Sequence, residues 1–169
     1  MRQIEFLVES NEDSICPTCG APLTARDHRK RVWKKERGEK SWVMIRRLVC
    51  TNKDCNHLHN ELPDFLIPYK HYESQLIEDV LEETITEDDV AEMDYPSLMT
   101  IKVWLEWFEK NISNIDGLIR SAVYRFFEFK DEFLKSKESL LEELRKRICP
   151  GWLGLIHRLI YNSGGFIPR

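Results

Sequence analysis

The sequence lacks the segments that would place a chain in or across a membrane. No apolar run approaches the roughly 20 residues of a membrane-spanning helix. Residues 1–10 show no basic stretch followed by an apolar core, and internal repeats and low-complexity segments are absent. We therefore expect a cytoplasmic protein with no secretory signal and no membrane partner. In that reducing compartment, paired cysteines are more often metal ligands or redox groups than structural disulfides.

Charge is present but unevenly distributed. The 169 residues are 42% hydrophobic and 32% charged, which suits one domain or a small module joined to a helical body. Residues 21–60 hold eleven Lys or Arg against four Asp or Glu, whereas residues 61–100 hold one Lys against twelve Asp or Glu. This asymmetry suggests that the first segment contacts a polyanion.

Four of the five cysteines form a C-x2-C pair and a C-x4-C pair, separated by thirty residues: Cys16, Cys19, Cys50 and Cys55. A redox C-x-x-C would be expected to begin a helix within a βαβ pattern, which is missing here. Four thiolates suit one structural, tetrahedral Zn²⁺, whose closed shell leaves no position for a catalytic water. A module of about forty residues also needs the folding free energy that a metal supplies.

Three further side chains near or outside this pattern need an interpretation. His57 and His59 offer more candidate ligands than one site requires, and we interpret them as surface groups or as groups that contact the ligands. Membership of either histidine in the metal shell stays open at this point. Cys149 stands alone in an apolar stretch and is expected to be a buried free thiol.

The order of the patterns predicts an α+β fold. Residues 30–35 and 41–50 are expected to form a β-hairpin around a turn at 36–39, in which Gly38 takes a positive φ. From residue 69 on, the apolar spacing is helical. The expected domains are a zinc ribbon with an extended linker at 1–68, a helix-turn-helix at 69–112, and C-terminal helices packing on it at 113–169.

The helical part is expected to contain several short and long helices. A helix over 72–83, a short helix over about 86–93 and a helix from Ser97 form the predicted helix-turn-helix. Its last helix has an expected core stripe made of Leu98, Ile101, Leu105, Phe108 and Ile112. Polar residues at 113–116 are expected to begin a new helix that extends to about Leu134, and two more helices are expected over 136–148 and 152–161.

Basic residues on the hairpin and on the predicted recognition helix are candidates for nucleic-acid binding. They are Arg29, Lys30, Arg31, Lys34, Lys35, Arg37, Arg46 and Arg47 on the hairpin, with Thr100 and Lys102 on the helix. Trp33 and Trp42 lie among them and could stack on bases. The alternative is that the charges only solvate the ribbon and the tryptophans pack on the helices. Acidic residues before Ser97 would oppose DNA contact there, so core packing or a protein contact is the alternative for that helix.

The motifs together resemble a known group of proteins. CPTCG at 16–20, the basic hairpin, the run from Arg46 to His59, and LPDFLIPYK at 62–70 resemble the N-terminal DNA-binding region of insertion-sequence transposases. More closely, the chain resembles an uncharacterised bacterial family of short zinc-ribbon proteins related to those transposases. The resemblance implies that the four cysteines ligate zinc and that the helix from Leu98 reads DNA. The downstream nuclease domain of the transposases has no counterpart here.

We therefore expect a DNA-binding protein with a structural zinc ion, acting as an accessory or regulatory factor of a mobile element. Binding of RNA, a transposase or another protein as partner, and a homodimer are further options. The competing hypothesis is an adaptor whose acidic helices dock on a basic protein. An enzyme is not expected, because no nucleophile–base pair or phosphate-binding loop accompanies the histidines.

Overall fold

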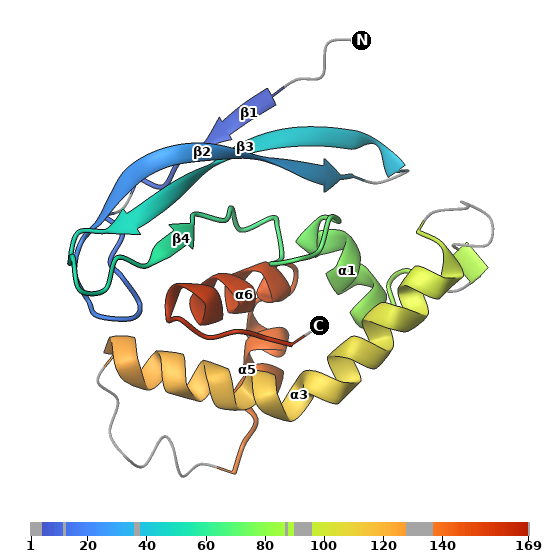
Figure 1. The fold of residues 1–169 in the computed structure, drawn as a ribbon. Coiled ribbons are helices and arrows are strands. Elements are labelled where there is room, and N and C mark those ends of the chain that lie inside the picture. Colours follow the sequence, from blue (N-terminus) through green and yellow to red (C-terminus); the bar gives the residue numbers. More distant parts are fainter. Residues whose placement is uncertain are drawn as a thin grey trace.

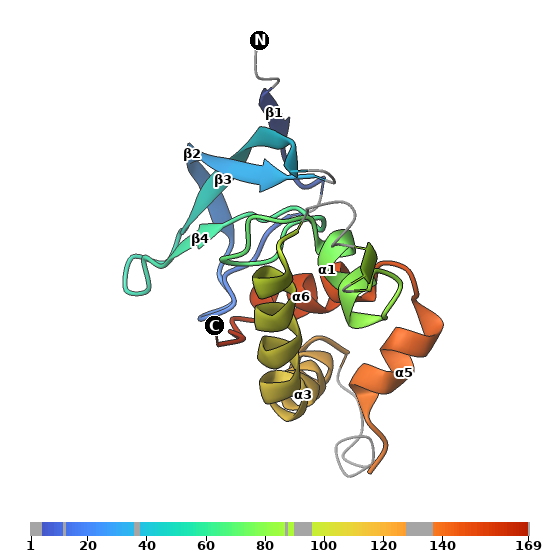
Figure 2. The ribbon, with the colours of Figure 1, turned by 90° about the vertical axis from the view of Figure 1, so that its right-hand side faces the viewer.

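The protein has an α+β fold in which a small sheet covers a group of helices (Figure 1, Figure 2). A computed structural model describes residues 5–11, 13–35, 38–86, 88–89, 96–127 and 137–168. The strands are β1 (Glu5–Val8), β2 (Leu23–Lys34), β3 (Lys40–Cys50) and β4 (Leu58–Asn60). The helices are α1 (Ser74–Leu81), α3 (Leu98–Phe127), α5 (Leu140–Arg147) and α6 (Trp152–Asn162). None of these helices has the length and apolarity to span a bilayer.

The predicted hairpin is present and is longer than expected. Strand β2 begins at Leu23 rather than near Lys30, and its polar, charged residues pair in antiparallel register with β3. Gly38 has the expected positive φ, 77°, at the turn. Strand β1 lies parallel to β3 on its other side, and β4 pairs antiparallel with the end of β3. The two long strands form a curved ribbon that arches over the helices (Figure 1).

Two apolar clusters hold the layers together. Under the ribbon, Val43 and Ile45 of β3 pack with Leu66, and Trp33 packs at the edge of this cluster. The larger cluster lies among α1, α3, α5 and α6 and includes the fully buried Trp152. Because side chains alternate along a strand, the face of β3 that carries Val43 and Ile45 is the one turned to the helical layer.

Helix α3 corrects the expected helix break at residues 113–116. The helix runs without interruption from Leu98 to Phe127, and the part of the expectation beyond residue 127 lies outside the described residues. No proline interrupts this stretch, and Ser113 and Asn114 are exposed on the helix surface. Asp116 does not begin a helix of its own. Its carboxylate accepts a hydrogen bond from the backbone N–H of Leu141 at the start of α5.

The expected core stripe of this helix is also partly wrong. Ile101 and Phe108 are buried as expected, but Leu98, Leu105 and Ile112 are 41%, 39% and 38% exposed. On the helix surface, these three residues lie on one side of Ile101 and Phe108, whereas the buried face extends to the other side. The buried face is instead continued by Trp104, Trp107, Ile115, Ile119 and Ala122.

The predicted helix-turn-helix stays a prediction. Residues 87 and 90–95, which would form its second helix and turn, lie outside the described residues. The capping contacts expected at 86–89 are present: Asp89 accepts from the backbone N–H of Thr86 at 2.8 Å, and the Asp89 N–H donates to the Thr86 hydroxyl at 3.3 Å. Ser97 likewise accepts from the N–H of Thr100 at 3.4 Å at the start of α3.

Candidate metal centre and basic ribbon

The first cysteine pair lies on a tight backbone loop before β2. The Cys16 N–H donates to the carbonyl of Ala21 at 2.8 Å, and the Gly20 N–H donates to the carbonyl of Cys16 at 2.8 Å. Gly20 has a φ of 75°, a conformation that glycine adopts without steric cost. The sequence CPTCG therefore folds into a turn in which the backbone N–H groups of Thr18 and Cys19 donate to the Cys16 sulfur.

The second pair is brought to the first by the register of the ribbon. Cys50 ends β3 and pairs directly with Leu23 at the start of β2. A turn follows in which the Cys55 and Asn56 N–H groups donate to the carbonyl of Asn52 at 3.1 and 2.8 Å. Asn56 adopts a left-handed φ of 44°. The hairpin thus returns the chain so that both pairs meet at its base.

The four predicted cysteines form one cluster that could hold a metal ion. Their sulfur atoms all lie within 4.8 Å of one another, with 3.8 Å between Cys16 and Cys55 and 3.4 Å between Cys19 and Cys50. All four are free thiols rather than disulfides. A tetrahedral ion with metal–sulfur bonds of about 2.3 Å places its sulfurs about 3.8 Å apart, so the cluster fits such an ion with little movement.

His59 contacts this cluster, whereas His57 is not part of it. The Nε2 atom of His59 lies 3.6 Å from the Cys16 sulfur, a hydrogen-bond contact to a ligand candidate. The two imidazole rings lie 4.7 Å apart, centre to centre. His57 is exposed. This geometry agrees with our interpretation of His59 as a group that contacts a ligand.

The thiols differ in how readily they ionise. Burial opposes ionisation of Cys16, but hydrogen bonds from the Cys19 N–H, from His59 and from the Thr18 N–H outweigh it and lower the pKa of Cys16 to about 5. Burial and the neighbouring thiols raise the pKa of Cys50 to about 12. Because the thiolate is the form of cysteine that ligates a metal, the lowered pKa leaves Cys16 in its metal-binding form at neutral pH.

The structure separates the predicted nucleic-acid residues of the ribbon into three groups. Arg29 and Lys30 are exposed on β2. Arg31, Lys34 and Lys35 are half-buried, and Arg31 donates to the carbonyls of Ile67 and Lys70 at 2.8 and 2.9 Å. Arg46 forms a two-pronged ion pair with Glu61 at 2.6 and 2.8 Å, and Arg47 pairs with Asp27. Arg37 lies outside the described residues.

Strand register places basic side chains on the ribbon face that points away from Val43 and Ile45. We call this the basic face, and it comprises His28, Lys30, Lys34, Lys40 and Arg46. The remaining β2 and β3 positions on that face, between residues 28 and 46, carry Val32, Trp42 and Met44. Glu5 of β1 is in register with Trp42, and acidic side chains border the face, because Glu61 and Glu9 pair with Arg46. His28, Lys30 and Lys40 are exposed there.

The two tryptophans of the ribbon have structural contacts. The Trp33 ring lies 4.7 Å from the ring of Phe65, and the Lys35 ammonium lies 4.4 Å from the Trp33 ring centre. Trp33 therefore packs on the segment that follows the ribbon, and this contact is not with a helix. Trp42 is half-buried, with the Lys30 ammonium 4.8 Å from its ring centre. On α3, the Thr100 side chain contacts Ser97 at 2.9 Å, and Lys102 is exposed.

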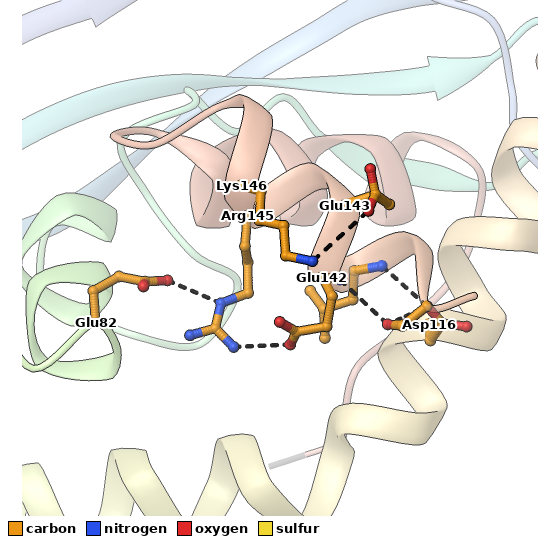
Figure 3. Close-up of polar contacts among 8 residues, drawn as sticks. Glu82, Asp116, Glu142, Glu143, Arg145 and Lys146 are labelled. Carbon is orange, nitrogen blue, oxygen red and sulfur yellow. Dashed lines mark hydrogen bonds and ion pairs between the residues drawn. The ribbon is translucent and has the colours of Figure 1, made fainter.

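Two acidic residues at the first helix, Glu78 and Glu82, make contacts with other helices of the protein. Glu78 of α1 is 1% exposed and accepts from the N–H groups of Gly151 and Leu153 at 2.6 and 2.9 Å, which satisfies the start of α6. Glu82 pairs with Arg145 of α5 at 2.9 Å (Figure 3). The sequence pattern gave one signal for Glu78: it follows Ile77 directly and falls on the buried side of a short amphipathic helix.

Cys149 corrects another expectation, since it is exposed rather than buried. It lies in the turn that leads into α6, where Gly151 adopts a φ of 110°. The apolar residues that suggested burial belong to α6 itself: Trp152, Leu153 and Ile156 are buried in the large cluster.

These features define a small α+β protein with a four-cysteine centre at the base of a basic β-ribbon. The chain belongs to the family DUF6431, described as a domain of unknown function, whose model matches residues 16–104. The match begins at Cys16 and includes all four clustered cysteines, the ribbon, α1 and the first part of α3. No curated protein and no solved structure is significantly similar to the chain.

Proposed function

We propose that this protein binds DNA through its basic face and that a zinc ion holds the ribbon in shape. The observation that carries the proposal is the run of basic residues at the β2 and β3 positions of one ribbon face, of which His28, Lys30 and Lys40 are exposed. Lysine and arginine side chains that meet phosphates release counterions, which provides affinity independent of sequence. A regular two-stranded ribbon keeps these charges at fixed spacing.

The proposed role of the zinc ion is structural. Cys16, Cys19, Cys50 and Cys55 would hold it, and four thiolates occupy all positions of a tetrahedral ion. The ion would tie the two strands together at the base of the ribbon, because one pair precedes β2 and the other lies at and beyond the end of β3. A soft thiolate set favours zinc over calcium or magnesium, which prefer oxygen ligands.

Two further parts of the proposal rest on the sequence. Reading of bases by Thr100 and Lys102 depends on the helix-turn-helix. The accessory role at a mobile element depends on the resemblance to transposases. The adaptor hypothesis needs exposed acidic side chains on the helices. Fewer are accessible than the composition suggested, because Glu78 and Glu82 make contacts inside the protein.

Binding to a labelled DNA duplex over a range of KCl concentrations tests the proposal. We expect affinity to fall with salt and the double variant Lys30→Gln/Lys40→Gln to lower the slope of log affinity against log salt by about 2. The matched control is Lys110→Gln/Lys146→Gln, which removes the same charge from exposed positions on α3 and α5.

Several outcomes would contradict the proposal. DNA binding is excluded if no complex forms at the lowest salt, and the basic face is excluded if both double variants lose affinity equally. An RNA duplex of the same sequence, measured in parallel, separates DNA from RNA preference. Association with a basic protein that survives nuclease treatment, with no DNA binding, would favour the adaptor.

A further inference from the structure

A cavity lies away from the four-cysteine cluster, between the segment 68–71, helices α3 and α6, and the segment 165–168. Its volume is about 320 Å³, at the lower end of the range of small-molecule sites. It brings together parts of the chain that are distant in sequence, which is the usual setting of a ligand site. The proposed DNA binding makes no use of it.

Aromatic rings form the walls of this cavity. Trp107, Tyr69, Tyr161 and Phe166 all line it. The Trp107 indole N–H donates to the carbonyl of Pro168 at 2.7 Å, which fixes the orientation of its ring. Tyr69 and Phe166 meet edge to face with ring centres 5.5 Å apart. Aromatic walls favour a planar ring as occupant, because edge-to-face contacts between rings are favourable.

The polar groups of the cavity are basic or neutral. The Lys70 ammonium lies 4.5 Å from the centre of the Trp107 ring, and His71 lies beside it on the lining. No Asp or Glu is among the described lining residues. Of two ligands with the same ring system, Lys70 therefore favours the one with an anionic group over the one with a cationic group.

His157 adds a second and independent observation. It lines the cavity, is 5% exposed, and stacks on Trp107 with ring centres 5.8 Å apart at 20°. Its Nε2 atom is shielded from solvent and has no hydrogen-bond partner among the described residues. A buried polar atom without a partner costs free energy, and a ligand, water or ion that hydrogen-bonds to it would remove that cost. Burial and Lys70 lower the pKa of His157 to about 3, so the imidazole is neutral and the charge preference rests on Lys70.

We infer that this cavity binds a small planar aromatic anion, with the ring between Trp107, Tyr69 and Phe166 and the anionic group toward Lys70. Two sources offer this chemistry: a free aromatic carboxylate and a purine nucleotide. The inference is independent of the proposed DNA binding by the ribbon, which lies on other residues.

Titration with a matched set of ligands tests the inference. 2-Naphthoate, 2-naphthamide and 2-naphthamidine share one ring system with charges of −1, 0 and +1, and dAMP represents the purine nucleotides. Calorimetry gives the affinities, and the indole N–H signal of Trp107 in NMR spectra reports where the ligand lies. We expect naphthoate or dAMP to bind, with naphthoate preferred about tenfold over the amide. Binding of dAMP alone assigns the site to nucleotides, and binding of naphthoate alone assigns it to carboxylates.

Two variants locate the site and its charge preference. Lys70→Gln should abolish the preference for naphthoate over naphthamide while the ring still binds. Val103→Trp should block the cavity, since Val103 lines it and is 50% exposed. Met99→Trp is the control on the same helix, 71% exposed and outside the lining.

The inference is overturned if neither naphthoate nor dAMP binds, if the amide or amidine binds as well as naphthoate, or if Val103→Trp binds as the wild type does. Equal loss of binding in Met99→Trp and Val103→Trp would also overturn it. Thermal unfolding of each variant shows that a lost affinity does not reflect a lost fold.

Discussion

Asp116 connects the middle of α3 to the start of α5 through a single carboxylate. It accepts hydrogen bonds from the Leu141 N–H and the Ser139 hydroxyl, both at 3.0 Å, and from Arg120 at 2.8 Å. Burial opposes its ionisation, but these donors outweigh burial and hold the pKa of Asp116 below its usual value. The ionised form is therefore the one that stabilises the fold.

The stability contribution of Asp116 depends on pH with a definite sign. Because the pKa is lower in the folded state, the contribution is present above the unfolded-state pKa of about 3.9 and is lost as pH falls through the folded-state pKa. We expect Asp116→Asn to lower stability by about 1–2 kcal/mol at neutral pH, and by progressively less below about pH 4. Urea unfolding of both proteins across this range measures the difference. A pH-independent difference would contradict the assignment.

His59 and His57 offer a matched pair of substitutions at the metal centre. His59 contacts the Cys16 sulfur, whereas His57 is exposed. A donor that contacts a ligand typically contributes 10–100-fold to metal affinity. We expect His59→Ala to weaken zinc binding by about that factor and His57→Ala to leave it nearly unchanged, as measured by competition with a chelating dye. Complete loss of zinc in either variant would instead make that histidine a ligand.

At the scale of elements, two glycines in helices are expected to respond in opposite ways to alanine. A Cβ at Gly117, midway along α3, would meet nothing within 4 Å. A Cβ at Gly154 in α6 would lie 2.4 Å from the carbonyl oxygen of Asp64. Gly117→Ala should stabilise the protein by about 0.5–1 kcal/mol, and Gly154→Ala should destabilise it by about 1–3 kcal/mol. Thermal unfolding measures both, and a destabilised Gly117→Ala would contradict the continuous helix.

Local features of the sequence predicted the ribbon well and predicted α3 less well. Gly38 specifies the turn locally, and a hairpin around that turn returns the second cysteine pair to the first, so the hairpin and the cysteine cluster could be predicted from the sequence. Ser113 and Asp116 carry the same local signal as a helix start, but the partner of Asp116 is at Leu141, which no local pattern reveals. The same limit applies to Arg31, whose acceptors lie in the segment after the ribbon.

Burial on α3 shows why the apolar pattern was ambiguous there. This helix has apolar residues on more than one face, so Leu105 and Ile112 matched a regular stripe as well as the buried residues did. Packing against α1, α5 and α6 selects the face with Trp104 and Ile115. Sequence periodicity identifies a helix, but the choice of buried face on a helix with several apolar sides depends on its neighbours.

For the whole molecule, the two apolar clusters predict that the ribbon and the helices respond differently to removal of the metal. The cluster under the ribbon is small, whereas the large cluster belongs to the helices. We expect one zinc ion per chain, and removal by a chelator should disorder the ribbon while most helical circular dichroism at 222 nm is retained. Cys50→Ser should reproduce this effect, and Cys149→Ser is the control because that thiol lies outside the cluster. Loss of all structure on chelation would contradict two separately stabilised layers.

Gly164, close to the end of α6, packs against Pro17, which lies between Cys16 and Cys19. A Cβ at Gly164 would lie 3.2 Å from the Cβ of Pro17. Synthesis of the chain therefore imposes an order on assembly. All four cysteines leave the ribosome long before Gly164 does, so the cysteine cluster and the ribbon can form early in synthesis, and the proposed zinc ion would bind at that stage. The loop that carries Pro17 meets Gly164 only after the last helix has been made.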